Sequence, residues 1–82
     1  MKIKSAYALN DTIIRFVTDN NEVYDFSMQE WLESSGSWLS QLKDTDYFKL
    51  VKVADDRDTF EWPNGQDVAP HELRAYAVKV NN

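Results

Sequence analysis

Three β-rich segments joined by very short turns constrain this chain most. Residues 2–9, 12–18 and 22–26 are rich in β-branched and aromatic residues. Asn10-Asp11 and Asp19-Asn20-Asn21 separate them, and Asn and Asp tolerate the left-handed backbone of tight turns. Connections this short join only antiparallel neighbours, so the sequence predicts an antiparallel β-meander.

Alternation of side chains within the first two segments predicts their faces, because successive residues of a strand point to opposite sides. The first segment places Ile3, Ser5, Tyr7 and Leu9 on one face, alternating with Lys2, Lys4, Ala6 and Ala8. The second segment places Ile14 and Phe16 on one face and Ile13 and Val17 on the other.

Short helices are predicted after the meander. Ser27-Met28-Gln29-Glu30 has the spacing of a capping box, and Phe26 and Trp31 occupy the two positions of a hydrophobic staple. This pattern predicts a helix that begins at Met28, with Ser27 accepting from the Glu30 N–H, and ends by Gly36. Two further helical pieces are expected over residues 37–42, with Trp38, Leu39 and Leu42 on one face, and over residues 44–48.

The second half of the chain predicts a hairpin and a final helix. Residues 50–54 and 59–62 are expected to be strands around the polar turn 55–58, and Pro63-Asn64-Gly65 ends the second strand. Pro70 suits the first turn of a helix that runs to about Ala77, followed by an Asn81-Asn82 tail. We therefore expect residues 1–82 to form a single α+β domain.

Charge is distributed unevenly along the chain. The net charge is −5, and residues 19–34 alone carry −5 through Asp19, Glu22, Asp25, Glu30 and Glu33. An acidic face suits a basic protein partner, whereas the simpler alternative is ordinary solvation of a surface. The acidic balance argues against a nucleic-acid binder with a basic footprint, unless Lys2, Lys4, Lys49 and Lys52 gather into one patch.

Residue types needed for catalysis or metal binding are scarce. The chain has no cysteine and one histidine, His71, which leaves neither a thiolate nor a zinc ligand set. Asp55, Asp56 and Asp58 lack the glycine and glutamate spacing of a calcium loop, so they are interpreted as a hairpin turn. We expect a non-enzymatic protein without cofactor or metal. The missing apolar leader and the absence of cysteine favour the cytoplasm, with no membrane contact.

A motif in the second half resembles a known family. The residues are Phe48 to Val53, Thr59-Phe60-Glu61-Trp62-Pro63-Asn64-Gly65, and Asp67-Val68-Ala69-Pro70-His71-Glu72-Leu73. They are similar to the small bacterial proteins of domain-of-unknown-function family 2442, whose signature is a strand ending in Trp-Pro-Asn-Gly before a Pro-initiated helix. The turn at Asn20-Asn21 departs from the Asp-Gly that is more usual there, although Asn serves the same turn.

The resemblance implies helices packed on a sheet and no established catalytic residues. Some relatives lie beside a small toxin and are suspected antitoxins, and others are fused to helix-turn-helix domains, for which this chain is expected to have no room. The resemblance therefore favours a protein-binding module that neutralises a small, basic partner such as a toxin. The alternatives are a regulatory or nucleic-acid-associated accessory and a mobile-element inhibitor that mimics nucleic acid.

Five residues are candidates for partner contact: Asp19, Glu22, Asp25, Glu30 and Trp62. Trp62 precedes a proline and an Asn-Gly reversal, a position that favours a structural role at the edge of the core, with an exposed aromatic anchor as the alternative. A core this small is not expected to cover all of the aromatic surface of Tyr7, Tyr24, Trp31 and Trp38. A homodimer that covers the rest is therefore a further hypothesis.

Overall fold

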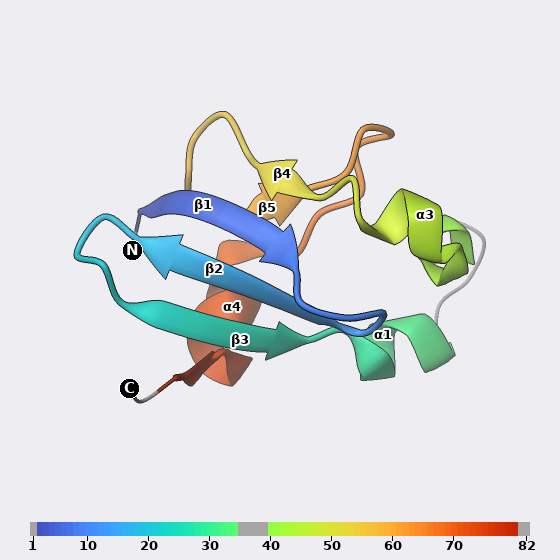
Figure 1. Cartoon of the computed structure of the whole chain (residues 1–82), viewed down its shortest axis with the longest axis horizontal. Helices are drawn as coiled ribbons and strands as arrows, with labels where there is room; N and C mark the ends of the chain where they lie inside the picture. The colour runs from blue at the N-terminus through green and yellow to red at the C-terminus, as the bar shows by residue number, and fades with distance from the viewer. Residues whose placement is uncertain (1, 35–39, 81–82) are drawn as a thin grey trace.

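The computed structural model describes residues 2–34 and 40–80 (Figure 1). The predicted Gly36 helix end and the predicted positions of Trp38 and Leu39 lie outside these residues. The elements in chain order are β1 Ile3–Ala8, β2 Ile13–Thr18, β3 Val23–Ser27, α1 Gln29–Ser34, the 3₁₀ helix η1 Gln41–Lys43, α3 Thr45–Phe48, β4 Lys52–Val53, β5 Phe60–Glu61, α4 Pro70–Tyr76 and β6 Val78–Lys79. The predicted α+β class is confirmed. None of the helices described in residues 2–34 and 40–80 is long and apolar enough to cross a membrane.

The predicted meander is confirmed as the main sheet. Strands β1, β2 and β3 pair antiparallel in chain order, and Asn21 adopts a positive φ of 63° in the β2–β3 turn. The sequence prediction missed β6, which extends the sheet to the order β1-β2-β3-β6. Tyr24 pairs with Lys79 and Asp25 with Val78, so the chain that leaves α4 returns to the edge of β3.

The predicted face of β1 is wrong beyond its first residues. The β1–β2 register shifts between Ile3, which pairs with Thr18, and Ser5, which pairs with Val17. Such a bulge places an extra residue in one strand and reverses the side chains that follow. Ile3 is therefore buried, whereas Tyr7 lies on the opposite face with 48% of its surface exposed. The alternation in β2 is as predicted, with Ile14 and Phe16 buried.

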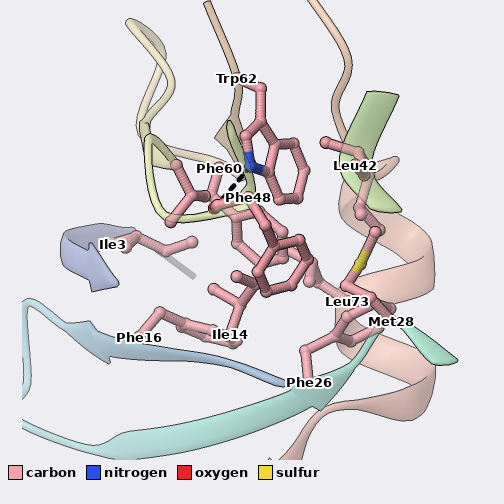
Figure 2. Packing of buried hydrophobic residues seen from close by; sticks show 12 residues of the cluster. Ile3, Ile14, Phe16, Phe26, Met28, Leu42, Phe48, Phe60, Trp62 and Leu73 are labelled. Carbon is pink, nitrogen blue, oxygen red and sulfur yellow. Dashed lines mark hydrogen bonds between the residues drawn. The ribbon is translucent and has the colours of Figure 1, made fainter. Parts of the chain in front are cut away.

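One hydrophobic core fills the space between the sheet, α4 and the β4–β5 hairpin. Figure 1 shows α4 behind β2 and β3, on the core side of the sheet, and Leu73 of this helix is buried in the core. Figure 2 shows apolar side chains from β1, β2, β3, η1, α3, β5 and α4 meeting here. The core cluster consists of Ile3, Ile14, Phe16, Phe26, Met28, Leu42, Phe48, Val51, Phe60, Trp62, Val68 and Leu73.

The start of α1 differs in detail from the predicted capping box. The helix begins at Gln29, and Ser27 Oγ accepts from the Gln29 N–H at 3.3 Å. Met28 is already bound to the sheet, because its N–H donates to the Thr12 carbonyl at 2.7 Å and its side chain is buried. The predicted staple is confirmed by the ring contact of Phe26 and Trp31, whose centroids are 5.2 Å apart.

The β4–β5 hairpin is shorter than predicted and is tied to the start of the chain. Arg57 takes a positive φ of 61° in its turn, and the Arg57 carbonyl accepts from the Ile3 N–H at 2.8 Å. Before the hairpin, Asp44 caps the single predicted turn α3 by accepting from the backbone N–H groups of Asp46 and Tyr47. A side-chain acceptor at this position satisfies N–H groups that have no partner within the helix.

The Trp-Pro-Asn-Gly segment closes the hairpin against α3. The Gly65 N–H donates to the Trp62 carbonyl at 2.9 Å, and Gly65 has a φ of 91°, which glycine adopts without steric cost. Trp62 is 0% exposed, and its indole Nε1–H donates to the Phe48 carbonyl at 2.9 Å (Figure 2). The buried Gln66 accepts from the Tyr47 hydroxyl at 2.8 Å. This motif is therefore a structural junction between the hairpin and α3.

Candidate functional site

The four-stranded sheet presents one face to the core and one face away from it. In Figure 1 the second face is turned to the viewer, and no helix described in residues 2–34 and 40–80 lies in front of it. We call this surface the open sheet face. The strand registers place the following side chains on it: Ser5, Tyr7, Ile13, Arg15, Val17, Val23, Asp25 and Val78.

An ion pair lies at the centre of the open sheet face. Arg15 donates through Nε and Nη2 to the two Asp25 carboxylate oxygens at 2.7 and 2.9 Å. The hydrogen bond to Asp25 raises the pKa of Arg15, and partial desolvation opposes this effect. The register extends the pair into a row across all four strands, with Tyr7 beside Arg15 and Val78 beside Asp25. This row is electrically neutral and ends in two exposed apolar side chains.

Apolar residues flank this ion pair on the neighbouring rows. Val17 pairs with Val23 on one side, and Ile13 pairs with Ser27 on the other, and all three apolar side chains are partly exposed. At the ends of the central row Tyr7 and Val78 are 48% and 67% exposed. The open sheet face is therefore an apolar surface with one charge pair at its middle.

The predicted acidic residues do not form a common surface. Asp19 pairs with Arg57, Glu22 pairs with Lys79 at 2.7 Å, and Asp25 pairs with Arg15. The Glu22 hydrogen bond raises the pKa of Lys79 above its usual value. The run of acids spans β3, so its members lie at opposite ends of the sheet, with the β2–β3 turn at one end and α1 at the other (Figure 1). Three of the predicted contacts are thus ion pairs within the fold.

Glu30, the fourth predicted residue, lies at a different feature. It lines a surface pocket of ≈ 140 Å³ together with Ser27, Trp31 and Tyr76. We call this the aromatic pocket. The Trp31 and Tyr76 rings lie with centroids 6.4 Å apart and planes inclined by 70°. The pocket is formed where β3 passes into α1 and where α4 ends, so residues distant in the sequence meet here.

Trp62, the fifth predicted residue, has no surface to offer a partner. Its side chain is 0% exposed and packs between the rings of Phe48 and Phe60, at centroid distances of 5.7 and 5.6 Å. The structural role favoured by the sequence is confirmed. The alternative of an exposed anchor is excluded by this burial.

Fewer aromatic side chains are left uncovered by the core than the sequence predicted. Tyr24 stacks on Phe16 at 5.4 Å, and Trp31 packs on Phe26. Tyr7 remains exposed, and Trp38 lies outside the described residues. The sequence prediction placed the end of α4 within one residue but did not identify Tyr76 as exposed, and it missed Val78 because β6 was not predicted. The β-branched pattern Val78-Lys79-Val80 is the signal for the missed strand.

Three lysines of the proposed basic patch, Lys2, Lys4 and Lys52, contact acidic or polar partners. Lys2 donates to Asp58 at 2.8 Å, which lowers the pKa of that carboxyl group, and Lys4 donates to the Asn21 side chain. Lys52 lies 3.9 Å from a Glu61 carboxylate oxygen. Lys2 and Lys52 are therefore each paired with a carboxylate, which disfavours a continuous basic surface.

The remaining candidates for chemistry are at the surface. His71 is exposed, and its Nε2 lies 3.5 Å from the neighbouring Glu72 carboxylate. Within residues 2–34 and 40–80, no group of three or more His, Cys, Asp or Glu side chains is arranged to hold a metal ion. A second pocket, of ≈ 80 Å³, lies at the β2–β3 turn between Lys2 and Tyr24.

Comparison with models of known protein families places the chain in one of them. The model of a family described as "Protein of unknown function (DUF2442)" matches residues 3–79. The match covers the meander, the aromatic pocket, the Trp-Pro-Asn-Gly junction and β6. The comparisons with curated proteins and with solved structures returned no match.

Proposed function

We propose that this chain, which belongs to the DUF2442 family through residues 3–79, is a non-catalytic protein-binding module of the antitoxin or inhibitor type. The open sheet face is its docking surface. The main support is the row of side chains across the four strands, Tyr7, Arg15, Asp25 and Val78. Its two central charges neutralise each other, and the side chains at its two ends are exposed and apolar.

The composition of the open sheet face fits a protein interface. Interface cores are depleted in isolated charges and enriched in tyrosine, arginine and other large side chains, surrounded by polar residues. Arg15 is already held by two hydrogen bonds, so its planar head is ordered before a partner arrives. Preorganisation of this kind lowers the entropy cost of binding. Val17, Val23 and Val78 supply apolar area that a partner removes from water.

The groups with altered pKa values support a binding role over a catalytic one. They are Arg15, Asp58 and Lys79, and each shift is caused chiefly by a hydrogen bond to one oppositely charged side chain. Catalytic groups are usually altered by desolvation together with a partner inside a cleft. Of these pairs, Arg15 and Asp25 lie on β2 and β3, so their hydrogen bonds tie together two strands of the sheet that carries the docking surface.

The partner is expected to be basic. The chain carries a net charge of −5, whereas the open sheet face is itself neutral at its centre. Long-range attraction then raises the association rate of a positively charged protein, and the apolar face supplies the contact area. The cysteine-free sequence is compatible with a reducing compartment, and we place this encounter in the cytoplasm.

A comparative capture experiment tests this proposal. The immobilised chain is exposed to a lysate of the source cells, and the stoichiometric partner is quantified by mass spectrometry for three proteins. These are the wild type, the open-face variant Tyr7→Glu/Val78→Glu, and the control Leu50→Glu. Leu50 is 53% exposed but lies between α3 and β4, away from the open sheet face. Circular dichroism verifies that all three are folded.

The proposal predicts that the open-face variant recovers at least about tenfold less partner, because two charges enter the apolar contact area. Leu50→Glu should recover as much as the wild type. Equal losses in both variants, or no loss in either, would contradict the assignment of this face. The inhibitor role is then tested by expressing the captured partner alone and with the chain, since neutralisation should restore growth. Recovery of the chain itself as the main partner would identify a homodimer instead.

A further inference from the structure

We propose that the aromatic pocket binds the cationic end of an arginine or lysine side chain presented by the partner. This rests on the proposed protein-binding function and names the kind of residue that the surface recognises. The pocket is lined by Ser27, Glu30, Trp31 and Tyr76. Two aromatic side chains and one carboxylate line it, and aromatic rings and carboxylates both attract a positive charge.

Ring geometry supplies the first part of the argument. The Trp31 and Tyr76 planes are inclined by 70° with centroids 6.4 Å apart, so the two rings form an open corner. A cation held within about 6 Å of a ring centroid is attracted by the negative face of the ring, and tryptophan attracts it most strongly. Two rings set at an angle let one cation lie near both faces. An isolated exposed tyrosine lacks this arrangement.

Support for the rings supplies the second part. Trp31 is packed against Phe26 at 5.2 Å and belongs to the partly buried border of the core. Tyr76 stands at the end of α4 with 63% of its surface exposed, so its ring remains accessible. One wall of the pocket is therefore fixed before binding, and the other is open to an incoming side chain.

Charge supplies the third part. Glu30 lines the pocket from the first turn of α1, and none of the residues that line it is basic. Glu33 lies on the same helix and accepts from the Gln29 amide at 3.1 Å. Glu30 is thus the charged residue of the pocket lining, and the whole chain carries a net charge of −5. A carboxylate beside an aromatic corner selects a cation over a neutral apolar group of the same length.

Pocket size and position indicate a side chain as the occupant. A volume of ≈ 140 Å³ suits the end of one side chain, whereas drug-sized ligands use pockets of about 300–1,000 Å³. Ser27 ends β3 beside Ile13, so the pocket borders the open sheet face. A partner lying on that face reaches the pocket with one long side chain.

The test uses small probes and no partner protein. Nα-acetyl-arginine amide and Nα-acetyl-lysine amide are titrated into ¹⁵N-labelled protein, with Nα-acetyl-citrulline amide as the neutral counterpart of the first. The readout is the indole Nε1–H signal of Trp31, assigned with Trp31→Phe. We expect saturable shifts for both cations with a Kd of about 1–10 mM, as for a single small contact. Citrulline should bind at least about fivefold more weakly.

Matched variants localise the effect. Tyr76→Leu and Glu30→Gln should each weaken cation binding about three- to tenfold, whereas Tyr76→Phe, which keeps the ring, should bind within about twofold of wild type. Tyr7→Leu and Glu33→Gln make the same chemical changes outside the pocket and should have no effect. Dispersed amide spectra verify that each variant is folded.

Three results would overturn the inference: no saturation by either cation, equal binding of citrulline, or equal weakening by the control variants. The capture experiment remains separate. If Tyr7→Glu/Val78→Glu loses the partner but the wild-type pocket does not bind the cationic probes, the pocket proposal is refuted and the docking face is supported. A pocket that binds cations in a chain that captures no partner would refute the proposed function instead.

Discussion

Removal of the Trp62 side chain should destabilise the fold more than any change on its surface. Trp62 is 0% exposed and contacts Phe48 and Phe60. Truncation of a buried tryptophan to alanine typically costs about 3–5 kcal/mol. It also leaves the Phe48 carbonyl without the indole donor, which adds about 1–3 kcal/mol if no water replaces it. A chain of 82 residues has a total stability of only about 4–12 kcal/mol. Trp62→Ala should therefore be largely unfolded.

Trp62→Phe separates the two contributions. Phenylalanine keeps a ring between Phe48 and Phe60 but cannot donate to the Phe48 carbonyl, so the loss should be intermediate. Urea denaturation followed by far-ultraviolet circular dichroism avoids the change in tryptophan fluorescence. The exposed Leu50→Ala serves as the control, and its free energy of unfolding should stay within about 0.5 kcal/mol of wild type.

The expected order of stability is wild type, then Trp62→Phe, then Trp62→Ala. A folded Trp62→Ala protein with the wild-type midpoint would refute the description of this motif as a structural junction. Equal midpoints for Trp62→Phe and wild type would refute only the contribution of the indole hydrogen bond.

Two further predictions concern a helix cap and an ion pair. Asp44→Ala should lower the free energy of unfolding by about 1 kcal/mol, because the N–H groups of Asp46 and Tyr47 lose their acceptor; an unchanged urea midpoint would contradict this. The hydrogen bond from Lys2 lowers the pKa of Asp58 below 3.8, so this carboxylate contributes stability above that pH, and the contribution is lost as the pH falls through the lowered value. Melting temperatures between pH 6 and pH 2 should therefore fall less steeply for Asp58→Asn than for wild type, and parallel curves would show that the pair contributes nothing.

Local signals in the sequence predicted most of the elements. The Asn-rich turns fix the meander, since Asn21 takes the positive φ that such a turn requires. The staple of Phe26 and Trp31 and the Pro70 start of α4 also depend on neighbours within a few residues. Interactions of this range can be read from spacing alone.

Features that depend on distant pairing were not predicted. The bulge in β1 follows from its register with β2, and it reverses the face on which Tyr7 lies. Strand β6 is only two residues long, and its pairing with β3 spans most of the chain. The same limitation applied to the acidic residues. A run of acids in the sequence predicts an acidic surface unless the basic residues that pair with them are known. Arg57 and Lys79, which pair with Asp19 and Glu22, are distant in sequence.

The candidate site was predicted only in part. Glu30 was identified from its charge, but the rings beside it come from α1 and the end of α4, which meet only in the folded chain. The open sheet face includes Asp25, one of the predicted contacts, although its role there is to hold Arg15. The sequence therefore identified some residues of the aromatic pocket and of the open sheet face, but it could not show that these two surfaces form.

Cross-saturation NMR on the chain bound to its captured partner tests the central claim most directly. The chain is deuterated with protonated Ile and Val methyl groups, and the unlabelled partner is irradiated. The open sheet face predicts saturation at Val17, Val23 and Val78, with none at the buried Ile14 and Val68. Saturation at Val53, in the β4–β5 hairpin, without saturation at Val17, Val23 and Val78 would contradict the assignment of the open sheet face as the docking surface.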